Sequence, residues 1–216
     1  RMGPVLKGVR DDIFLATKVN YPDAKRCREE FETSLKLLQT DHVDLLYQHC
    51  VGVLIGRKGG KSDTETMLAP GGSLEFLKEV KTAGLARNIG ISVHYQYEPT
   101  LTLLDASDAY DVIMPFVNYV ERARHNPEKH VMEVACKKGI GLAAMKVLGG
   151  NGQLADEYDR AFRYSLSVPG VAVNVVGCRN ADEVRRAARA ARDFRPLTDA
   201  EMKETTQLGQ RLVDAE

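Results

Sequence analysis

Short apolar runs alternate with stretches of helical periodicity along this chain. Six such runs occur, and each is followed by a segment whose apolar residues recur at helical spacing. Strict alternation of this kind predicts a parallel sheet with helices outside it, and the nearly continuous apolar character of the runs predicts strands buried on both faces. The expected strands cover residues 13–18, 40–49, 87–93, 112–117, 141–145 and 171–176.

Capping residues support the intervening helices. Ser, Asp, Asn and Thr accept hydrogen bonds from the first turn of a helix, proline suits its first position, and glycine often follows its last residue. The segment T-D-A-E near the carboxyl end has the form of a capping box and predicts one extra helix. The expected boundary residues are Asp23, Ser73, Pro127, Asn180 and Thr198 at helix starts, and Gly84 and Gly139 at helix ends.

Composition sets limits on the class of protein. A chain of 216 residues is long enough for one large domain, and no linker is evident, so we expect a single domain over residues 1–216. Lys+Arg and Asp+Glu are equal at 30 each, so net charge does not favour nucleic acid or anionic lipid as a partner. No apolar run approaches the roughly 20 residues of a membrane helix. The first residues, RMGPVLKGVRDD, lack the apolar centre of a secretory signal.

The four cysteines are widely separated and form no CxxC pair. Scattered cysteines are typical of reduced thiols in an intracellular protein, so we expect a cytoplasmic location and neither a disulfide framework nor a zinc site. These cysteines are Cys27, Cys50, Cys136 and Cys178.

Two polar side chains close neighbouring apolar runs. IFLATK ends at Lys18, and TDHVDLLYQH ends at His49. The carboxyl ends of parallel strands are where such a sheet presents its chemistry, so these two side chains are catalytic candidates. A lysine beside a histidine or tyrosine lowers the pKa of its partner. The alternatives are a buried histidine satisfied by a backbone carbonyl and a solvated lysine at a strand end.

Two glycine-containing segments resemble phosphate sites. GRKGGKS ends like the phosphate loop GxxxxGK[ST], but Ile55 stands where its first glycine is needed, so we expect a mobile loop overhanging the site. At the last strand, Gly177–Asn180 opens a helix whose backbone N–H groups suit a phosphate, with Arg179 adding a charge-assisted contact. No GxGxxG follows the first strand, which argues against a classical dinucleotide fold. The arginines farther along, Arg185, Arg186, Arg189 and Arg192, are expected to form a solvated face.

Several segments together resemble the aldo-keto reductases, in particular a bacterial branch of that family. The resemblance runs in order from about residue 11 to residue 194 and implies a (β/α)8 TIM barrel. It also implies reduction of aldehydes and ketones to alcohols by hydride transfer from NADPH, less often NADH, bound at the carboxyl rim of the strands. The segments are FLATKV, FETSLKLLQTDHVDLLYQH, GLARNIGISVH, LAAMKVLGGNGQL and VAVNVVGCRNADEV.

The resemblance implies roles for individual residues. Lys18 and His49 match the family's catalytic lysine and histidine, and Ser92 matches a serine near the nicotinamide carboxamide. Val93 falls where many members carry asparagine. Asn118 matches an asparagine in the next strand that commonly supports the nicotinamide.

The remaining matches concern the rest of the cofactor. Met145 stands where many members stack a tyrosine on the nicotinamide, and Lys146 is expected to face the pyrophosphate. Glu183 falls where NADPH-specific members often place an arginine, and an acid there would repel a 2′-phosphate, so both NADPH and NADH remain expected cofactors. The loop that holds the adenosine phosphate is matched by Gly177, Cys178, Arg179 and Asn180.

One departure from the family pattern lies at the front of the chain. The family's aspartate and tyrosine occupy a motif like DTAxxYG in the first two βα units, and this sequence has no such motif. We therefore expect six of eight βα units plus a carboxyl-terminal helix, with the first two units missing. Three origins fit this expectation: a fragment of a longer product, a sequence from which residues are missing, or a truncated relative.

Three functional hypotheses follow. The first is a carbonyl reductase that is inactive as this chain alone, because Tyr47, the nearest substitute acid in sequence, is expected in the core. The second is a non-catalytic barrel remnant that acts through cofactor binding or self-association, since an incomplete barrel leaves two open strand edges. The third is a barrel enzyme of different chemistry, such as a lyase that uses Lys18 as a Schiff base.

Overall fold

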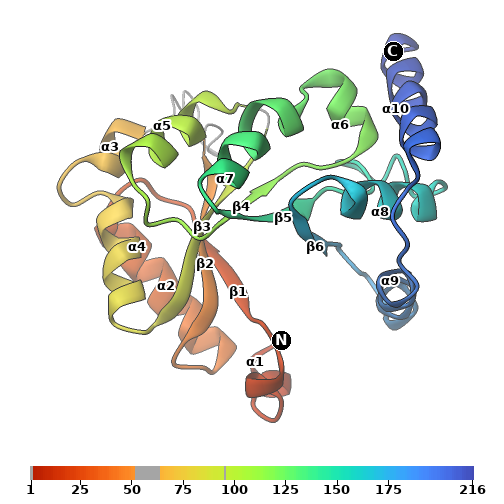
Figure 1. Ribbon diagram of the computed structural model, residues 1–216. Coiled ribbons are helices and arrows are strands. Elements are labelled where there is room, and N and C mark those ends of the chain that lie inside the picture. Colours follow the sequence, from red (N-terminus) through yellow and green to blue (C-terminus); the bar gives the residue numbers. More distant parts are fainter. Residues whose placement is uncertain (1, 52–63, 95) are drawn as a thin grey trace. The chain divides into compact units, whose positions relative to one another are not determined.

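Six strands form a sheet in chain order, β1 to β6, in a computed structural model that describes residues 2–51, 64–94 and 96–216 (Figure 1). The β1–β2, β2–β3 and β5–β6 pairs are parallel. This confirms the six strands and the parallel sheet expected from the apolar runs. The strands are β1 Ala16–Val19, β2 Val43–Val51, β3 Ala86–Val93, β4 Val112–Pro115, β5 Gly141–Met145 and β6 Val171–Val175.

Helices occupy the connections between the strands. The longest, α2 and α10, are both capped as the sequence predicts. The Asp23 side chain accepts a hydrogen bond from the Arg26 N–H at the start of α2, and Thr198 and Glu201 form a capping box at the start of α10. The helices are α1 Gly3–Leu6, η1 Arg10–Asp12, α2 Ala24–Leu38, α3 Thr64–Leu68, α4 Ser73–Thr82, α5 Glu98–Ala106, α6 Tyr119–Arg124, η2 Glu128–Met132, α7 Glu133–Lys137, α8 Tyr158–Ser167, α9 Ala181–Arg192 and α10 Asp199–Asp214.

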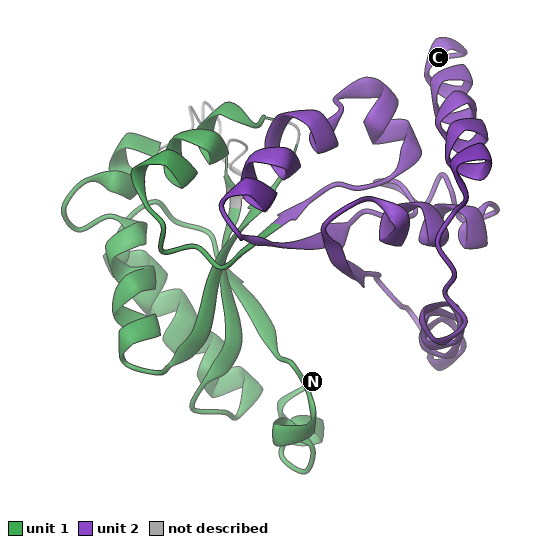
Figure 2. Ribbon diagram, in the orientation of Figure 1, with its two compact units in different colours: residues 1–113 green, residues 114–216 purple. Residues whose placement is uncertain are grey.

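The chain divides into two compact units, Arg1–Ile113 and Met114–Glu216 (Figure 2). In the first unit, α2 and α4 lie beside the β1–β3 strands (Figure 1). The rings of Phe31 on α2 and Phe76 on α4 meet edge to face, with centroids 6.1 Å apart, and both side chains are buried. Helix α2 is therefore fixed by apolar packing in addition to its caps.

The register of β1, β2 and β3 brings three residues into one row. Lys18 pairs with Tyr47, and Tyr47 pairs with Gly90. A Cβ on Gly90 would lie 2.5 Å from the Val112 carbonyl oxygen and 2.9 Å from the Tyr47 ring, so only glycine fits beside this tyrosine. The pairing of these three residues is therefore fixed by close side-chain packing at Gly90 as well as by the backbone hydrogen bonds of the sheet.

An ion cluster holds the amino ends of the same strands. The buried carboxylate of Asp44 on β2 accepts hydrogen bonds from Arg10 (2.9 Å), Arg87 (2.8 Å) and the Leu15 N–H (2.8 Å). The side chains of Asp44 and Arg10 are only 4% and 12% exposed. Burial alone would raise the pKa of Asp44, but the Leu15 N–H and the two guanidinium groups hold that pKa below its ordinary value.

The second unit contains β5, β6 and the helices α6 to α10. Helices α6 and α10 approach closely at the buried Gly209 of α10. A Cβ added to this glycine would lie only 2.1 Å from the Tyr119 carbonyl oxygen, so the contact requires glycine. The rings of Tyr119 and Tyr164 meet edge to face at 5.8 Å. By contrast, α9 contains no buried residue.

Several expected boundaries were wrong. Strand β2 continues past His49 because its pairing with β3 resumes at Val51↔Val93 after a register shift. Ser73 is the first residue of α4 rather than its cap. The N-cap is Gly72, where an added Cβ would lie 2.3 Å from the Thr66 carbonyl oxygen. The helix expected at residues 155–165 begins at Tyr158, after turns in which Gly152 and Leu154 accept hydrogen bonds.

Other features agree with expectation or extend it. Gly84 and Gly139 follow helix ends with positive φ, as predicted. The helix expected after Pro127 starts as a π-helical turn, η2, and the short helices α1, α3 and α6 had no predicted counterpart. The GRKGGKS segment lies outside the described residues.

We expect Asp44→Asn to lower the free energy of unfolding by about 3 kcal/mol at neutral pH, because it leaves the largely buried Arg10 without its carboxylate. The folded-state pKa of Asp44 is lowered, so its contribution is fully present above the ordinary value of 3.8 and is lost as pH falls below it through the folded-state value. Urea unfolding of both proteins at neutral and at acid pH measures this. The exposed neighbour variant Asp12→Asn is the control, and equal stability of Asp44→Asn and wild type at neutral pH would contradict the account.

Candidate active site

Three expected site residues lie toward the carboxyl ends of adjacent strands in the first unit. Lys18 is on β1, His49 on β2 and Ser92 on β3. Since β1, β2 and β3 are parallel, all three share one end of this part of the sheet. Lys18 and His49 are partly exposed, whereas Ser92 is fully buried.

Tyr47 lies two residues before His49 on β2, in the row of paired residues Lys18, Tyr47 and Gly90. The Lys18 Nζ is 5.7 Å from the centroid of the Tyr47 ring, and the tyrosine is only 4% exposed. Burial raises the pKa of Tyr47 to about 12. The low exposure confirms the expected place of Tyr47 in the core. A phenol with a raised pKa is also a poor acid at neutral pH.

His49 contacts a side chain that the sequence did not single out. Its Nδ1 lies 2.6 Å from the Oδ1 of Asn20, in the turn after β1. The Asn20 backbone N–H donates to Glu30 Oε2 at 2.7 Å, and its side-chain Nδ2 donates to Glu30 Oε1. The partner of the His49 ring at this nitrogen is therefore a side-chain amide rather than a backbone carbonyl.

In the second unit, Asn118, Met145 and Lys146 lie at the carboxyl ends of β4 and β5. Asn118 caps α6, since its Oδ1 accepts from the N–H groups of Val120 (3.0 Å) and Glu121 (2.8 Å), and its Nδ2 donates to the Lys146 carbonyl at 2.9 Å. Lys146 has φ +55°, a left-handed conformation that is uncommon outside glycine. Such an outlier, held by a neighbouring amide, is typical of a functional position. Met145 is buried at the end of β5.

The junction of β6 and α9 already holds a carboxylate. Asn180 caps α9 by accepting the Glu183 N–H at 2.9 Å, as the sequence predicts. Glu183 in turn accepts from the Arg179 backbone N–H (2.7 Å) and from the Arg179 Nε (3.1 Å). These Arg179 contacts lower the pKa of Glu183. A built-in anion at this helix start shows that the local field favours negative charge.

A cavity of about 530 Å³ opens beside this junction, within the second unit. Four expected cofactor residues line it: Gly177, Cys178, Arg179 and Glu183. Sequence reasoning missed the other walls, which come from the loop after β5, the start of α8, the end of β6 and the middle of α9. The positive φ of Gly149 and Gly152 marks that loop, so the LGGNG segment was the available signal. The missed lining residues are Leu148, Asn151, Gly152, Ala155, Tyr158, Val176 and Arg186.

Arg186 is exposed, as expected, and it also lines this cavity. Its guanidinium carbon lies 3.9 Å from the centroid of the Tyr158 ring, a cation–π contact. Burial raises the pKa of Tyr158, and Arg186 partly offsets this effect. Arg185, Arg189 and Arg192 are exposed, as predicted.

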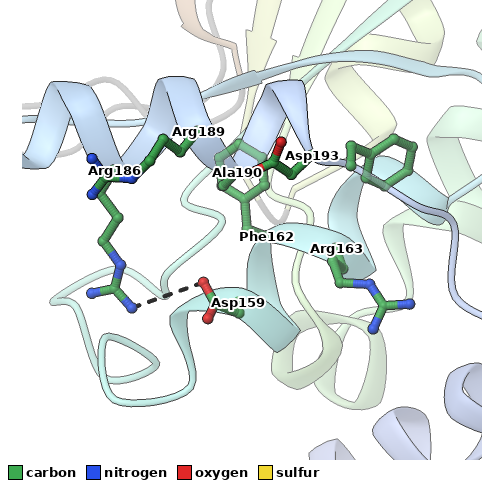
Figure 3. A pocket seen from close by; sticks show the side chains of 8 residues that line it. Asp159, Phe162, Arg163, Arg186, Arg189, Ala190 and Asp193 are labelled. Carbon is green, nitrogen blue, oxygen red and sulfur yellow. Dashed lines mark ion pairs between the residues drawn. The ribbon is translucent and has the colours of Figure 1, made fainter.

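A second cavity, of about 410 Å³, lies between α8 and α9 (Figure 3). Three arginines line it, but so do two carboxylates, Asp159 and Asp193. Arg163 is bound to Glu201 at 3.1 Å, and Arg186 points toward Asp159 at 3.9 Å (Figure 3). The charges in its wall are thus largely compensated, and the cavity has no excess positive charge to hold an anion.

Metal and disulfide chemistry find no support in the part of the chain that the structure describes. Within residues 2–51, 64–94 and 96–216, no three His, Cys, Asp or Glu side chains are grouped as a metal site requires. Cys27, Cys136 and Cys178 are free thiols, and burial raises the pKa of Cys27 to about 12. Among the described helices, none has the length and apolar character to cross a membrane.

A parallel α/β sheet whose strands follow one another in chain order, with polar residues at their carboxyl ends, fits the (β/α)8 barrel class. The sequence model of the aldo/keto reductase family matches residues 2–163, and the chain belongs to this family. The expected resemblance is thereby confirmed.

Known relatives are similar over part of their length. Prostaglandin-E(2) 9-reductase of Oryctolagus cuniculus is 30% identical over 153 residues, which are 66% of this chain and 46% of the relative. Protein tas of Escherichia coli is 30% identical over the same shares of the two chains. The chain spans about half the length of the curated relatives it matches.

Solved structures confirm the fold. The holo form of aldo-keto reductase AKR11C1 from Bacillus halodurans superposes with a TM-score of 0.76 at 24% identity, covering 96% of this chain and 76% of that one. An aldo-keto reductase from Klebsiella pneumoniae in complex with NADPH gives a TM-score of 0.74 at 19% identity, covering 97% and 74%. The six strands and their helices therefore fit a partial (β/α)8 barrel.

Proposed function

We propose that this chain is part of an NAD(P)H-dependent oxidoreductase that reduces aldehydes or ketones to alcohols. The observation that carries the proposal is the 530 Å³ cavity, where Gly177, Cys178 and Arg179 line a helix start that already attracts a carboxylate. Family membership supports an oxidoreductase in general. We place both units in one barrel domain over residues 1–216 and the reaction in the cytoplasm.

The residues present fit a nicotinamide dinucleotide. Arg179 and the backbone of Gly177–Asn180 suit the adenosine phosphate, because N–H groups at a helix start and a guanidinium both bind phosphate oxygens. Lys146 is assigned to the pyrophosphate, and Ser92, Asn118 and Met145 to the nicotinamide end. The carboxylate of Glu183 would repel the 2′-phosphate of NADPH, so we propose NADH as an alternative cofactor to NADPH.

Lys18 and His49 are assigned to the carbonyl substrate. When bound, the nicotinamide supplies the hydride for carbonyl reduction. His49 orients the carbonyl oxygen through its ring nitrogen, and Lys18 supplies positive charge that favours negative charge on nearby oxygen. The buried Tyr47 does not serve as the acid, because burial raises its pKa to about 12.

Arg179→Glu is expected to weaken binding of both NADPH and NADH by about tenfold or more, because a charge-assisted hydrogen bond becomes a repulsion. Glu183→Gln should strengthen NADPH binding, since it removes the carboxylate that competes for the Arg179 N–H. Calorimetric titration of each variant measures these changes. The control is Arg185→Glu, which changes an exposed arginine on α9 that pairs with Asp182. Unchanged affinity in Arg179→Glu would show that the phosphate site is misassigned.

The 216-residue chain alone is expected to show little carbonyl reductase activity. A positioned acid contributes about 10²–10⁴-fold to such a rate, and the family's DTAxxYG motif does not occur in this sequence. The assay is NADPH oxidation with a panel of aldehydes, comparing this chain with a version extended at its amino end by two βα units that carry the motif. Comparable turnover by the shorter chain, abolished by Tyr47→Phe, would contradict the proposal.

Self-association is the second candidate function, and exposed apolar residues of β6 and α9 favour it. Val173 and Val175 on β6 are 51% and 45% exposed, and Val184 on α9 is 54% exposed. Exposed aliphatic side chains on a strand are typical of a surface that pairs with another chain. We propose that a second copy of this chain covers this surface.

Sedimentation velocity over a range of concentrations tests the association. Wild type is expected to form dimers or larger species as concentration rises. Val173→Lys should shift the protein toward monomer, because it places a charge on the apolar strand. Val5→Lys changes a valine of the first unit that is 72% exposed and should leave the association unchanged. A wild-type monomer at every concentration would rule this candidate out.

A further inference from the structure

A chain of side chains links helix α2 to strand β2 in the first unit. Glu30 on α2 accepts from the Asn20 side chain, and the Asn20 Oδ1 lies 2.6 Å from the His49 Nδ1. We propose that Asn20 and Glu30 are positioning residues that fix the ring orientation and the neutral tautomer of His49, with the hydrogen on Nδ1. The importance of this tautomer for catalysis rests on the proposed function, whereas the tautomer itself does not.

Hydrogen-bonding capacity alone decides the direction of each bond. A carboxylate only accepts, so the NH2 group of Asn20 must face Glu30. The carbonyl oxygen of the same amide must then face His49. An amide oxygen also only accepts, and the His49 Nδ1 therefore carries the hydrogen. No other arrangement of the two groups satisfies both contacts.

The turn that carries Asn20 is held by contacts that do not involve its side chain. The Asn20 backbone N–H donates to Glu30 Oε2 at 2.7 Å. The buried Gln48 donates from Nε2 to the Tyr21 carbonyl at 3.2 Å, and the Cys27 thiol donates to the same carbonyl at 3.0 Å. The amide of Asn20 is thus presented to His49 by a preorganised backbone, and truncating it leaves that backbone anchored.

The tautomer determines what His49 offers at its second nitrogen. With the hydrogen on Nδ1, the neutral ring has a lone pair at Nε2 and can only accept there. It donates from Nε2 only in its doubly protonated form, and the Asn20 oxygen satisfies Nδ1–H in both forms. His49 therefore orients a carbonyl oxygen by donation from Nε2 as the imidazolium, and in the neutral form it accepts the hydroxyl proton of an alcohol.

Nitrogen-15 NMR of the histidine rings in the 216-residue chain tests this assignment. The neutral His49 ring should show the Nδ1–H pattern, with its resonances assigned by their loss in His49→Gln. Asn20→Ala should return the ring to the Nε2–H form that prevails in solvated histidine. Glu30→Gln should give a mixture, because an amide at position 30 allows Asn20 to turn either way. Glu29→Gln removes the same charge from the same helix and should change nothing.

His42 serves as an internal reference, since its Nδ1 lies 2.7 Å from Asp41 Oδ1 and its resonances should not respond to changes at position 20. An Nε2–H pattern for wild-type His49, or an Nδ1–H pattern that survives Asn20→Ala, would overturn the proposal. The NMR experiment needs neither cofactor nor turnover, so its failure is distinct from failure to bind NAD(P)H. In the extended, active chain, Asn20→Ala should lower kcat about tenfold with little change in KM, and an effect confined to KM would also count against the assignment.

Discussion

The parallel register of β1, β2 and β3 is the constraint on which the arrangement of the first unit depends. It sets Lys18 opposite Tyr47 and Tyr47 opposite Gly90. A slip of one residue would turn every side chain of a strand to the other face and separate Lys18 from the Tyr47 ring. A slip of β3 would bring a residue with a side chain to the position of Gly90. Its Cβ would clash with the Val112 carbonyl and the Tyr47 ring, so the packing around Gly90 opposes the slip.

The two ends of these strands use polar groups differently. At the amino ends, Asp44 draws Arg10, Leu15 and Arg87 together in a buried, charge-compensated cluster whose role is stability. At the carboxyl ends, Lys18 and His49 are partly exposed, and the Asn20 amide links His49 to Glu30, an arrangement that suits binding and chemistry. This division is the one expected of a parallel barrel, where function gathers at the carboxyl rim. In the second unit, the cavity likewise lies at the carboxyl ends of β5 and β6.

Local sequence patterns predicted the elements, but not the partners of the site residues. Apolar periodicity and capping chemistry placed six strands and the caps Asp23, Asn180 and Thr198, because these signals act within a few residues. Asn20 and His49 are 29 residues apart and meet only through the β1–β2 register, which no local pattern encodes. The contact of the exposed Arg186 with Tyr158 was likewise not predicted, since it depends on how α9 lies against α8. The cap at Ser73 failed because close packing at Gly72 excludes any side chain there.

Binding of a nicotinamide nucleotide at the β6–α9 junction of the second unit is the central claim. An NMR titration of the 216-residue chain with NADPH tests it most directly, with the Arg179 amide as reporter and the amide of the exposed Arg185 as reference. We predict that the Arg179 signal shifts along a saturable binding curve while the Arg185 signal changes little. An Arg179 signal that stays unchanged as NADPH is added, or one that shifts no more than the Arg185 signal, would contradict the claim.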